Sequence, residues 1–381
     1  MSFYQQYLDE SHTLLRESVR RFVATKISPF INDWEEQNSF PLNLYREAGA
    51  AGFLGIGYDE QYGGSPGDIF HKLIVGEELL KAGSAGLVAS LSSLDIALPP
   101  IAKWGNAALK EKVVPQVISG EKISALAITE PGGGSDVANI KTRAVREGNF
   151  YRVNGSKTFI TSGMRADFYT VAVRTGGEGF AGISLLMIEK GTPGFSTGKN
   201  LKKMGWWASD TAELFFDDCL VPVENLIGAE NAGFVAIMAN FQSERLMLSL
   251  MANTTSQLAL DTSLQYSKER SAFGKPIAKY QVNKHKLAEM ATRLEVSKTM
   301  MYSVACLMHQ GKSCIKEVSM AKNFATDVSD YITYEAVQLF GGMGFMRESL
   351  VERLYRDNRI LSIGGGTREI MQEIISKHMG L

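Results

Sequence analysis

The spacing of hydrophobic residues along the chain changes twice. Over residues 1–120 apolar side chains recur at steps of three and four, as at Leu15 and Val19, and this spacing predicts amphipathic helices. Over 121–228 the pattern becomes short runs bounded by glycine and proline, which predicts strands. Over 229–381 the helical spacing returns in long segments separated by glycines. We therefore expect an N-terminal helical domain, a middle β domain and a C-terminal helical domain.

The middle domain carries the strand signals. Runs rich in apolar and β-branched residues at 168–173, 183–188 and 212–216 predict three strands. Asn154-Gly155 separates two alternating runs and predicts a hairpin turn. Strands do not alternate with helices along the chain, so a doubly wound parallel sheet is disfavoured. The expected class is α+β, with a small barrel or sandwich in the middle and a bundle of antiparallel helices at the end.

Composition and charge exclude several classes of protein from the possible functions of this chain. The chain has 381 residues, of which 45% are hydrophobic, so it can bury a large core in more than one domain. Its net charge of −1 lacks the basic surplus of a nucleic-acid-binding protein. The three cysteines form no CxxC pair and the five histidines no HExxH motif, so no metal site is predicted. Without a signal peptide, a transit peptide or a run of about 18 apolar residues, a cytoplasmic bacterial protein with no membrane span is expected.

One charged residue interrupts an apolar helix. Between residues 231 and 260 only Glu244 and Arg245 are charged. Glu244 falls on the helix face that carries Ile237, Phe241, Leu248 and Met251. Burial raises the pKa of a carboxyl group, which suits a general base working near neutrality. A structural glutamate paired with an arginine would give the same pattern, and the pattern does not decide between them.

Four glycine-containing segments are candidate ligand sites. The loop 129–136 is rich in glycine, serine and threonine, so its backbone N–H groups could approach a ligand, although a plain surface turn would look the same. Residues 363–367 lead into a helix that Thr367 could cap, which makes either an anion site or an ordinary helix start. The segments 268–275 and 338–345 could hold phosphate and a flat ring, or could be exposed connections.

Together these segments resemble a known family. The chain carries TEPGGGSD at 129–136, GSKTFITSG at 155–163, ERSAFGKPI at 269–277, QLFGGMGF at 338–345 and IGGGT at 363–367, in that order. In motifs, length and α-β-α order it resembles the acyl-CoA dehydrogenases from end to end. The resemblance implies a C-terminal four-helix bundle behind a barrel-like middle domain, bound FAD and a homotetramer. It also implies α,β-dehydrogenation of an acyl-CoA, with electrons passed to electron-transferring flavoprotein.

The resemblance also assigns site residues. The expected FAD contacts are Leu126, Ile128, Thr129, Gly134, Ser135, Phe159, Ile160, Thr161, Arg270, Phe273, Gln281, Gln338, Gly341, Gly342, Thr367 and Glu369. Of these, Arg270, Phe273 and Gln281 resemble residues that reach the FAD of a neighbouring subunit. The expected substrate contacts are Ser135, Phe241, Arg245, Gly364 and Gly366.

The chain departs from the family pattern at the catalytic position. Most members carry Tyr-Glu where this chain has Gly364-Gly365. The isovaleryl-CoA and long-chain branches instead place the glutamate on the first long helix of the C-terminal domain, in a Glu-Arg-Leu context that Glu244 matches. The resemblance therefore implies that Glu244 is the base and that the backbone N–H of Gly365 binds the thioester carbonyl.

The acyl chain is expected to be medium-to-long or branched, because the two glycines leave room beside the reacting carbons. Three alternatives stay open. An acyl-CoA oxidase or flavin monooxygenase on the same fold would use oxygen directly. A catalytically silent acyl-CoA-binding flavoprotein would bind without turnover, and an assembly scaffold would not need a complete FAD site.

Overall fold

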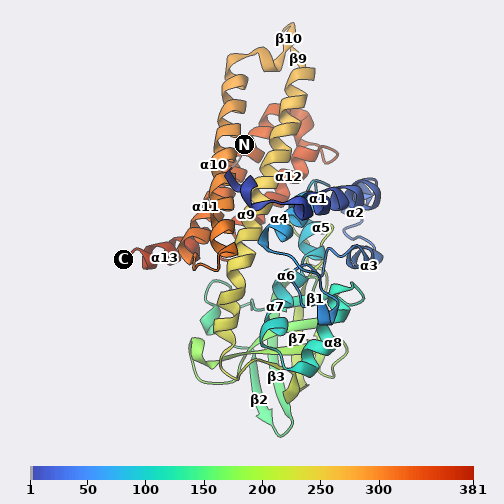
Figure 1. Cartoon of the computed structure of the whole chain (residues 1–381), viewed down its shortest axis with the longest axis vertical. Helices are drawn as coiled ribbons and strands as arrows, with labels where there is room; N and C mark the ends of the chain where they lie inside the picture. Colours follow the sequence, from blue (N-terminus) through green and yellow to red (C-terminus); the bar gives the residue numbers. More distant parts are fainter. Residues whose placement is uncertain (1–2) are drawn as a thin grey trace.

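The computed structural model describes residues 3–381 and shows helices, then a sheet, then helices along the chain (Figure 1). The N-terminal part contains α1 (Glu10–Phe22), α2 (Ile31–Glu36), α3 (Asn43–Ala50), α4 (Ile69–Leu80), α5 (Ala85–Leu91), α6 (Leu94–Ala97), α7 (Pro99–Trp104) and α8 (Ala107–Ile118). Both α1 and α4 begin with an aspartate whose carboxylate caps the helix and with a histidine three residues later that reaches back.

The middle part is one mixed sheet of eight strands in the order β6-β7-β3-β2-β4-β5-β8, with β1 pairing in parallel with β4. The strands are β1 (Ser124–Ala127), β2 (Arg143–Glu147), β3 (Phe150–Thr161), β4 (Phe168–Arg174), β5 (Ile183–Glu189), β6 (Phe195–Thr197), β7 (Thr211–Pro222) and β8 (Leu226–Ile227). The three predicted strands are confirmed as β4, β5 and part of β7. All but the last residue of β4 and of β5 are buried, which explains their continuous apolar runs.

The predicted hairpin turn at Asn154-Gly155 is wrong. Both residues lie inside β3, where the register with β7 shifts between Val153 and Gly155. Asn154 Nδ2 donates a 3.0 Å hydrogen bond to Asp218 Oδ1 on β7, and the backbone N–H of Asp218 donates a 2.8 Å bond to Asn154 Oδ1. A Cβ on Gly155 would lie 2.7 Å from Thr142 Cα, so the glycine marks a bulge and a close approach of two backbones rather than a turn.

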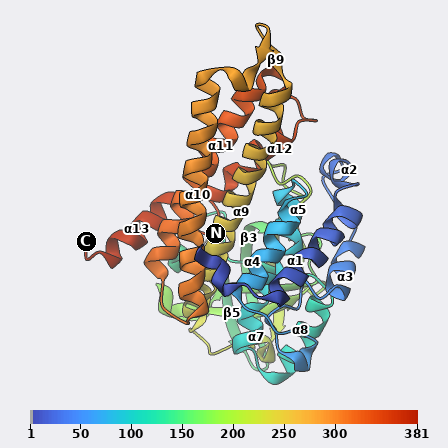
Figure 2. The same cartoon turned by 45° about the horizontal axis from the view of Figure 1, so that its top comes forward.

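The C-terminal part contains α9 (Gly233–Glu269), α10 (Gln281–His309), α11 (Ile315–Phe340), α12 (Leu350–Asn358) and α13 (Arg368–His378). Figures 1 and 2 show α9, α10 and α11 side by side, with α9 starting beside the sheet. Far from the sheet, α9 and α10 are joined by β9 (Ser271–Ala272) and β10 (Lys275–Pro276), and α13 projects sideways from the body.

One hydrophobic core runs from the N-terminal helices through the sheet and includes Ile237, Leu248 and Met251 of α9. The start of α9 is therefore held between the sheet and the N-terminal helices, and this is where Glu244 lies. Among residues 3–381, no single helix is long and apolar enough to cross a membrane, although the bent pair Ala85–Leu91 and Leu94–Trp104 would be by length and composition alone.

Candidate active site

Glu244 carries a carboxylate oxygen that has no hydrogen-bond partner among the described residues. Its side chain is half-buried on α9, and this oxygen, Oε2, is buried. Burial raises the pKa of Glu244 to about 7, although the charges of Arg245 and Lys322 act to lower it. A buried carboxylate oxygen without a partner is costly in an isolated chain. Here it leaves a proton acceptor free for a molecule that binds beside it.

The segment 363–367, called the glycine loop below, lies against this carboxyl group. Gly365 has φ +64°, and a Cβ on it would lie 2.4 Å from Leu248 Cδ1 and 3.5 Å from Glu244 Oε1. Glycine is required here for both the backbone conformation and the space. Arg245 Nε donates a 3.3 Å hydrogen bond to the Gly365 carbonyl, and Lys322 Nζ donates to the Gly366 carbonyl. Cations on α9 and α11 therefore fix the loop in place.

Lys322 did not feature in the sequence interpretation. It is fully buried on α11, where burial lowers its pKa to about 8 although Glu244 raises it. The signal was present, because Lys322 is in register with Val318, Ala325 and Ser329, all buried. The same pattern of one charge on an apolar face that singled out Glu244 also identifies Lys322.

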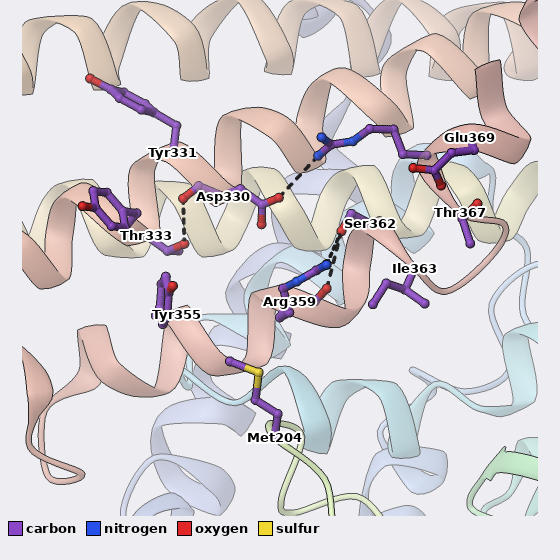
Figure 3. A pocket seen from close by; sticks show the side chains of 12 residues that line it. Met204, Asp330, Tyr331, Thr333, Tyr355, Arg359, Ser362, Ile363, Thr367 and Glu369 are labelled. Carbon is purple, nitrogen blue, oxygen red and sulfur yellow. Dashed lines mark hydrogen bonds and ion pairs between the residues drawn. The ribbon is translucent and has the colours of Figure 1, made fainter.

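A cavity of about 510 Å³ opens beside the glycine loop. Figure 3 shows it between α11, α12 and the start of α13, with Met204 of the middle domain at its edge. Thr367 caps α13 by accepting a 3.3 Å hydrogen bond from the N–H of Ile370. Arg368 pairs with Asp327 and Asp330, and its Nε is buried without a partner among the described residues. The predicted contacts Thr367 and Glu369 both line this cavity.

The loop 129–136 is anchored by a buried ion pair. Lys157 on β3 is fully buried, and its Nζ lies 2.8 Å from Glu130 Oε1 and 3.0 Å from the Ile128 carbonyl oxygen. Glu130 also accepts hydrogen bonds of 2.6 and 2.8 Å from the backbone N–H groups of Lys141 and Thr142. The loop 129–136 is therefore held at its base, while Gly134 and Ser135 stay exposed.

Phe159 occupies a strained position next to this loop. It has φ +60° at a shift in the β3–β7 register, and 69% of its surface is exposed. Thr158 beside it donates its N–H to the Thr129 carbonyl at 2.9 Å, which joins the strand to the loop. Residues in strained backbone conformations are concentrated at functional sites, so Phe159 is a candidate ligand contact. Ile128 and Ile160 are buried, whereas Leu126 and Thr161 are half-buried.

The remaining predicted FAD contacts lie elsewhere. Arg270, Phe273 and Gln281 are exposed around the β9–β10 hairpin, at the opposite end of the molecule from β3 (Figure 1). Gln338, Gly341 and Gly342 lie at the end of α11, near the same hairpin, where the rings of Tyr266 and Phe340 stack 3.9 Å apart. Within one chain the structure does not bring these six residues to the loop 129–136.

Solved structures and curated proteins that resemble the chain define its family. Family models for acyl-CoA dehydrogenases match it throughout, with the N-terminal domain at 9–121, the middle domain at 125–219 and the C-terminal domain at 231–380. An acyl-CoA dehydrogenase of Bacillus subtilis is 39% identical over 98% of this chain and 99% of its own length. The mitochondrial long-chain specific acyl-CoA dehydrogenase of Rattus norvegicus is 38% identical over 98% of this chain and 88% of its own length. The caffeyl-CoA reductase-Etf complex subunit CarC of Acetobacterium woodii is 36% identical over 97% of this chain and 98% of its own length.

The structural comparison agrees. A probable acyl-CoA dehydrogenase from Mycobacterium abscessus superposes with a TM-score of 0.96 at 50% identity, covering 98% of this chain and 100% of that one. A glutaryl-CoA dehydrogenase from Mycobacterium smegmatis in complex with FADH2 superposes with a TM-score of 0.92 at 26% identity, covering 98% and 96%. The chain belongs to the acyl-CoA dehydrogenase family, and it is therefore an FAD-dependent oxidoreductase.

The residues present fit this cofactor. Phe159 offers an exposed aromatic face to a flat ring. A Cβ on Gly132 would meet nothing within 4 Å, so the neighbouring backbone is open to close approach. The cavity at Thr367 is lined by Arg368, a guanidinium suited to an oxygen-rich group, whose Nε has no partner among the described residues.

Proposed function

We propose that this acyl-CoA dehydrogenase uses Glu244 as the base that removes the α-proton of a medium-to-long or branched acyl-CoA. The observation that carries the proposal is the buried, unpartnered Oε2 of Glu244 beside the glycine loop. The pKa of about 7 favours proton transfer near neutral pH. Glu244 therefore supplies the carboxyl function that Gly365 cannot.

The chain's own residues account for binding, orientation and proton removal. The backbone N–H of Gly365 is the proposed donor to the thioester carbonyl, where it stabilises charge that develops as the α-proton leaves. Arg245 and Lys322 hold the carbonyls on either side of this loop, so the donor is fixed before substrate arrives. Bound FAD supplies the acceptor for the hydride equivalent from the β-carbon. Phe159 and the loop 129–136 are the proposed contacts to its ring system.

The proposed substrate class follows from the space at the loop. A Cβ on Gly364 would meet only the Ile360 carbonyl oxygen within 4 Å, at 3.6 Å. At Gly365 Leu248 already occupies the position of a Cβ, so the open space lies at Gly364, where most family members carry a tyrosine. The open space beside Gly364 supports a substrate whose acyl chain is long, or is bulky near the reacting carbons.

An anaerobic titration with straight and branched acyl-CoAs tests the proposal. We expect the flavin absorbance to bleach with medium-to-long or branched thioesters. Bleaching with short straight chains alone would refute the substrate class but not dehydrogenation. No bleaching in protein that retains FAD would make the chain a silent binder. Rapid peroxide release in air without another acceptor would instead identify an oxidase.

The pH profile is a direct prediction from the position of Glu244. Because the base must be ionised, kcat/KM should fall about tenfold for each pH unit below about 7 and level off above it. The rate should be measured between about pH 5.5 and 9 with an artificial electron acceptor. A profile that stays flat down to about pH 5, near the usual pKa of glutamate, would contradict the raised pKa.

We also infer that electron-transferring flavoprotein accepts the electrons and that the protein is a homotetramer. The first inference is supported by the similarity to CarC, whose name places it in a complex with Etf. The second is supported by Phe273, which is 98% exposed and lies at the far hairpin with Arg270 and Gln281. These residues could contact FAD only in another copy. Light scattering tests the tetramer, and reduction of electron-transferring flavoprotein by substrate-reduced enzyme tests the partner.

A further inference from the structure

We propose that His12, Asp68 and His71 form a binding site for a divalent transition-metal ion of the zinc class, beside His309, which lies on the second carboxylate oxygen of Asp68. Three of the five histidines in the chain meet at this one aspartate. They come from the start of α1, the start of α4 and the end of α10. Figure 2 shows these helices approaching one another beside the N-terminus, where the N-terminal helices meet the C-terminal bundle.

The donor atoms have nearly the spacing that zinc requires. His12 Nε2 and His71 Nδ1 lie 3.2 and 2.8 Å from Asp68 Oδ1, and His309 Nδ1 lies 3.1 Å from Asp68 Oδ2. One ligand atom from each of His12, Asp68 and His71 falls within 4.8 Å of the other two. Bonds of about 2.0–2.1 Å in a tetrahedron separate ligand atoms by roughly 3.3 Å. An ion bound at His71 Nδ1 would replace the 3.3 Å hydrogen bond that this atom accepts from the backbone N–H of Asp68.

The two helix caps hold the ligands in place. Asp9 caps α1 and Asp68 caps α4, each followed three residues later by a histidine that reaches back to the cap. His12 Nδ1 lies 2.9 Å from Asp9 Oδ1, which leaves its Nε2 directed at Asp68. A carboxylate behind a histidine that presents its other nitrogen is the usual outer shell of a protein-bound zinc ion. Asp9 is therefore assigned as a positioning residue.

The charge balance of the cluster also favours a cation. Asp68 Oδ1 also accepts hydrogen bonds of 2.9 and 3.1 Å from the backbone N–H groups of Phe70 and His71, and these donors carry no full positive charge. In the described part of the chain, Asp68 pairs with the three imidazoles and with no lysine or arginine. A bound divalent ion would bring a full positive charge to this carboxylate.

An ion has a route into the site. The side chain of His12 is 5% exposed, whereas those of Asp68 and His309 are 26% and 39% exposed. On the other side, the rings of Tyr7 and Phe70 stack 5.4 Å apart and Phe70 lies 5.5 Å from the His309 ring. The cluster is thus open on one side and backed by aromatic rings on the other. A bound ion would tie the start of α1 to the start of α4.

Calorimetric titration of the FAD-loaded enzyme with Zn²⁺, after removal of metal with a chelator, tests the site. We expect one ion per chain and a rise in the unfolding temperature. His12→Ala and His71→Ala should each weaken binding at least about tenfold and abolish that rise. His285→Ala, which removes an exposed histidine far from the cluster, should leave both unchanged. Co²⁺ should give absorption bands at wavelengths beyond those of the flavin.

A second variant separates loss of ligand from loss of fold. Asp68→Asn keeps a residue that caps helices well but removes the charge, so it should fold and still bind Zn²⁺ at least about tenfold more weakly. Dehydrogenation of acyl-CoA should be unaffected by Asp68→Asn, because the site lies outside the machinery around Glu244. Zinc binding that is absent from the wild type, that survives Asp68→Asn and both histidine variants, or that is lost in His285→Ala would overturn the proposal.

Discussion

Replacing Glu244 by glutamine should lower the rate of acyl-CoA dehydrogenation by about 10²–10⁴-fold while FAD and acyl-CoA still bind. Glutamine has nearly the same size and can fill the same space beside Gly365, but it cannot take a proton. The flavin spectrum of the purified variant measures cofactor retention, and anaerobic mixing with acyl-CoA measures the rate of bleaching. Full activity would remove Glu244 from the role of base and leave it a structural residue.

The matched control is Asp261→Asn, which changes an exposed carboxylate on the same helix, outside the segments assigned to ligands. It should leave the rate unchanged. Stability provides a second readout, because the folded-state pKa of Glu244 is raised above the value of 4.5 expected in the unfolded chain. The unfolded state therefore loses this proton at lower pH than the folded state, and stability falls between the two values as pH rises. Glu244→Gln should unfold at a higher temperature than the wild type above about pH 7 and at a similar one below about pH 4.5.

The position of the proposed base could be read from the sequence because its signal is local. Glu244 stands almost alone as a charge over thirty residues of apolar helix, and a helix brings its neighbours at fixed steps onto one face. The α-β-α order could also be predicted from the sequence, because the spacing of apolar residues stays helix-like or strand-like over many residues in each part. The glycines at 364–366 were visible too, but their purpose became clear only when Leu248 was found 2.4 Å from the position of a Cβ on Gly365.

Features that depend on distant partners could not be read in this way. Asn154-Gly155 is a good turn sequence, but pairing of Asn154 with Asp218 keeps it inside a strand. Lys157 and Glu130 belong to two separate motifs, and nothing in either motif shows that the two side chains form one buried pair. His12, His71 and His309 have no metal-site spacing along the chain, because three different helices bring them together.

The buried pair of Lys157 and Glu130 gives the second large prediction. Replacing Lys157 by methionine should destabilise the protein by about 3–5 kcal/mol, because it leaves the Glu130 carboxylate buried without its cation. Burial already lowers the pKa of Lys157 to about 8 although Glu130 raises it, so the pair carries a substantial desolvation cost. The two backbone N–H groups that also bind Glu130 reduce the loss but bring no full positive charge. Urea unfolding measures the change in free energy.

The same substitution should loosen the loop 129–136 and therefore weaken FAD binding, because Lys157 also holds the Ile128 carbonyl at 3.0 Å. Lys141→Met is the matched control, since the exposed Lys141 reaches Glu130 only through its backbone N–H, which methionine retains. It should keep both stability and flavin content. If Lys157→Met proved as stable as the control and equally yellow after gel filtration, the ion pair would not anchor the loop. The loop would then have to be held by the bond between Thr158 and Thr129 and by the packing of Ile128.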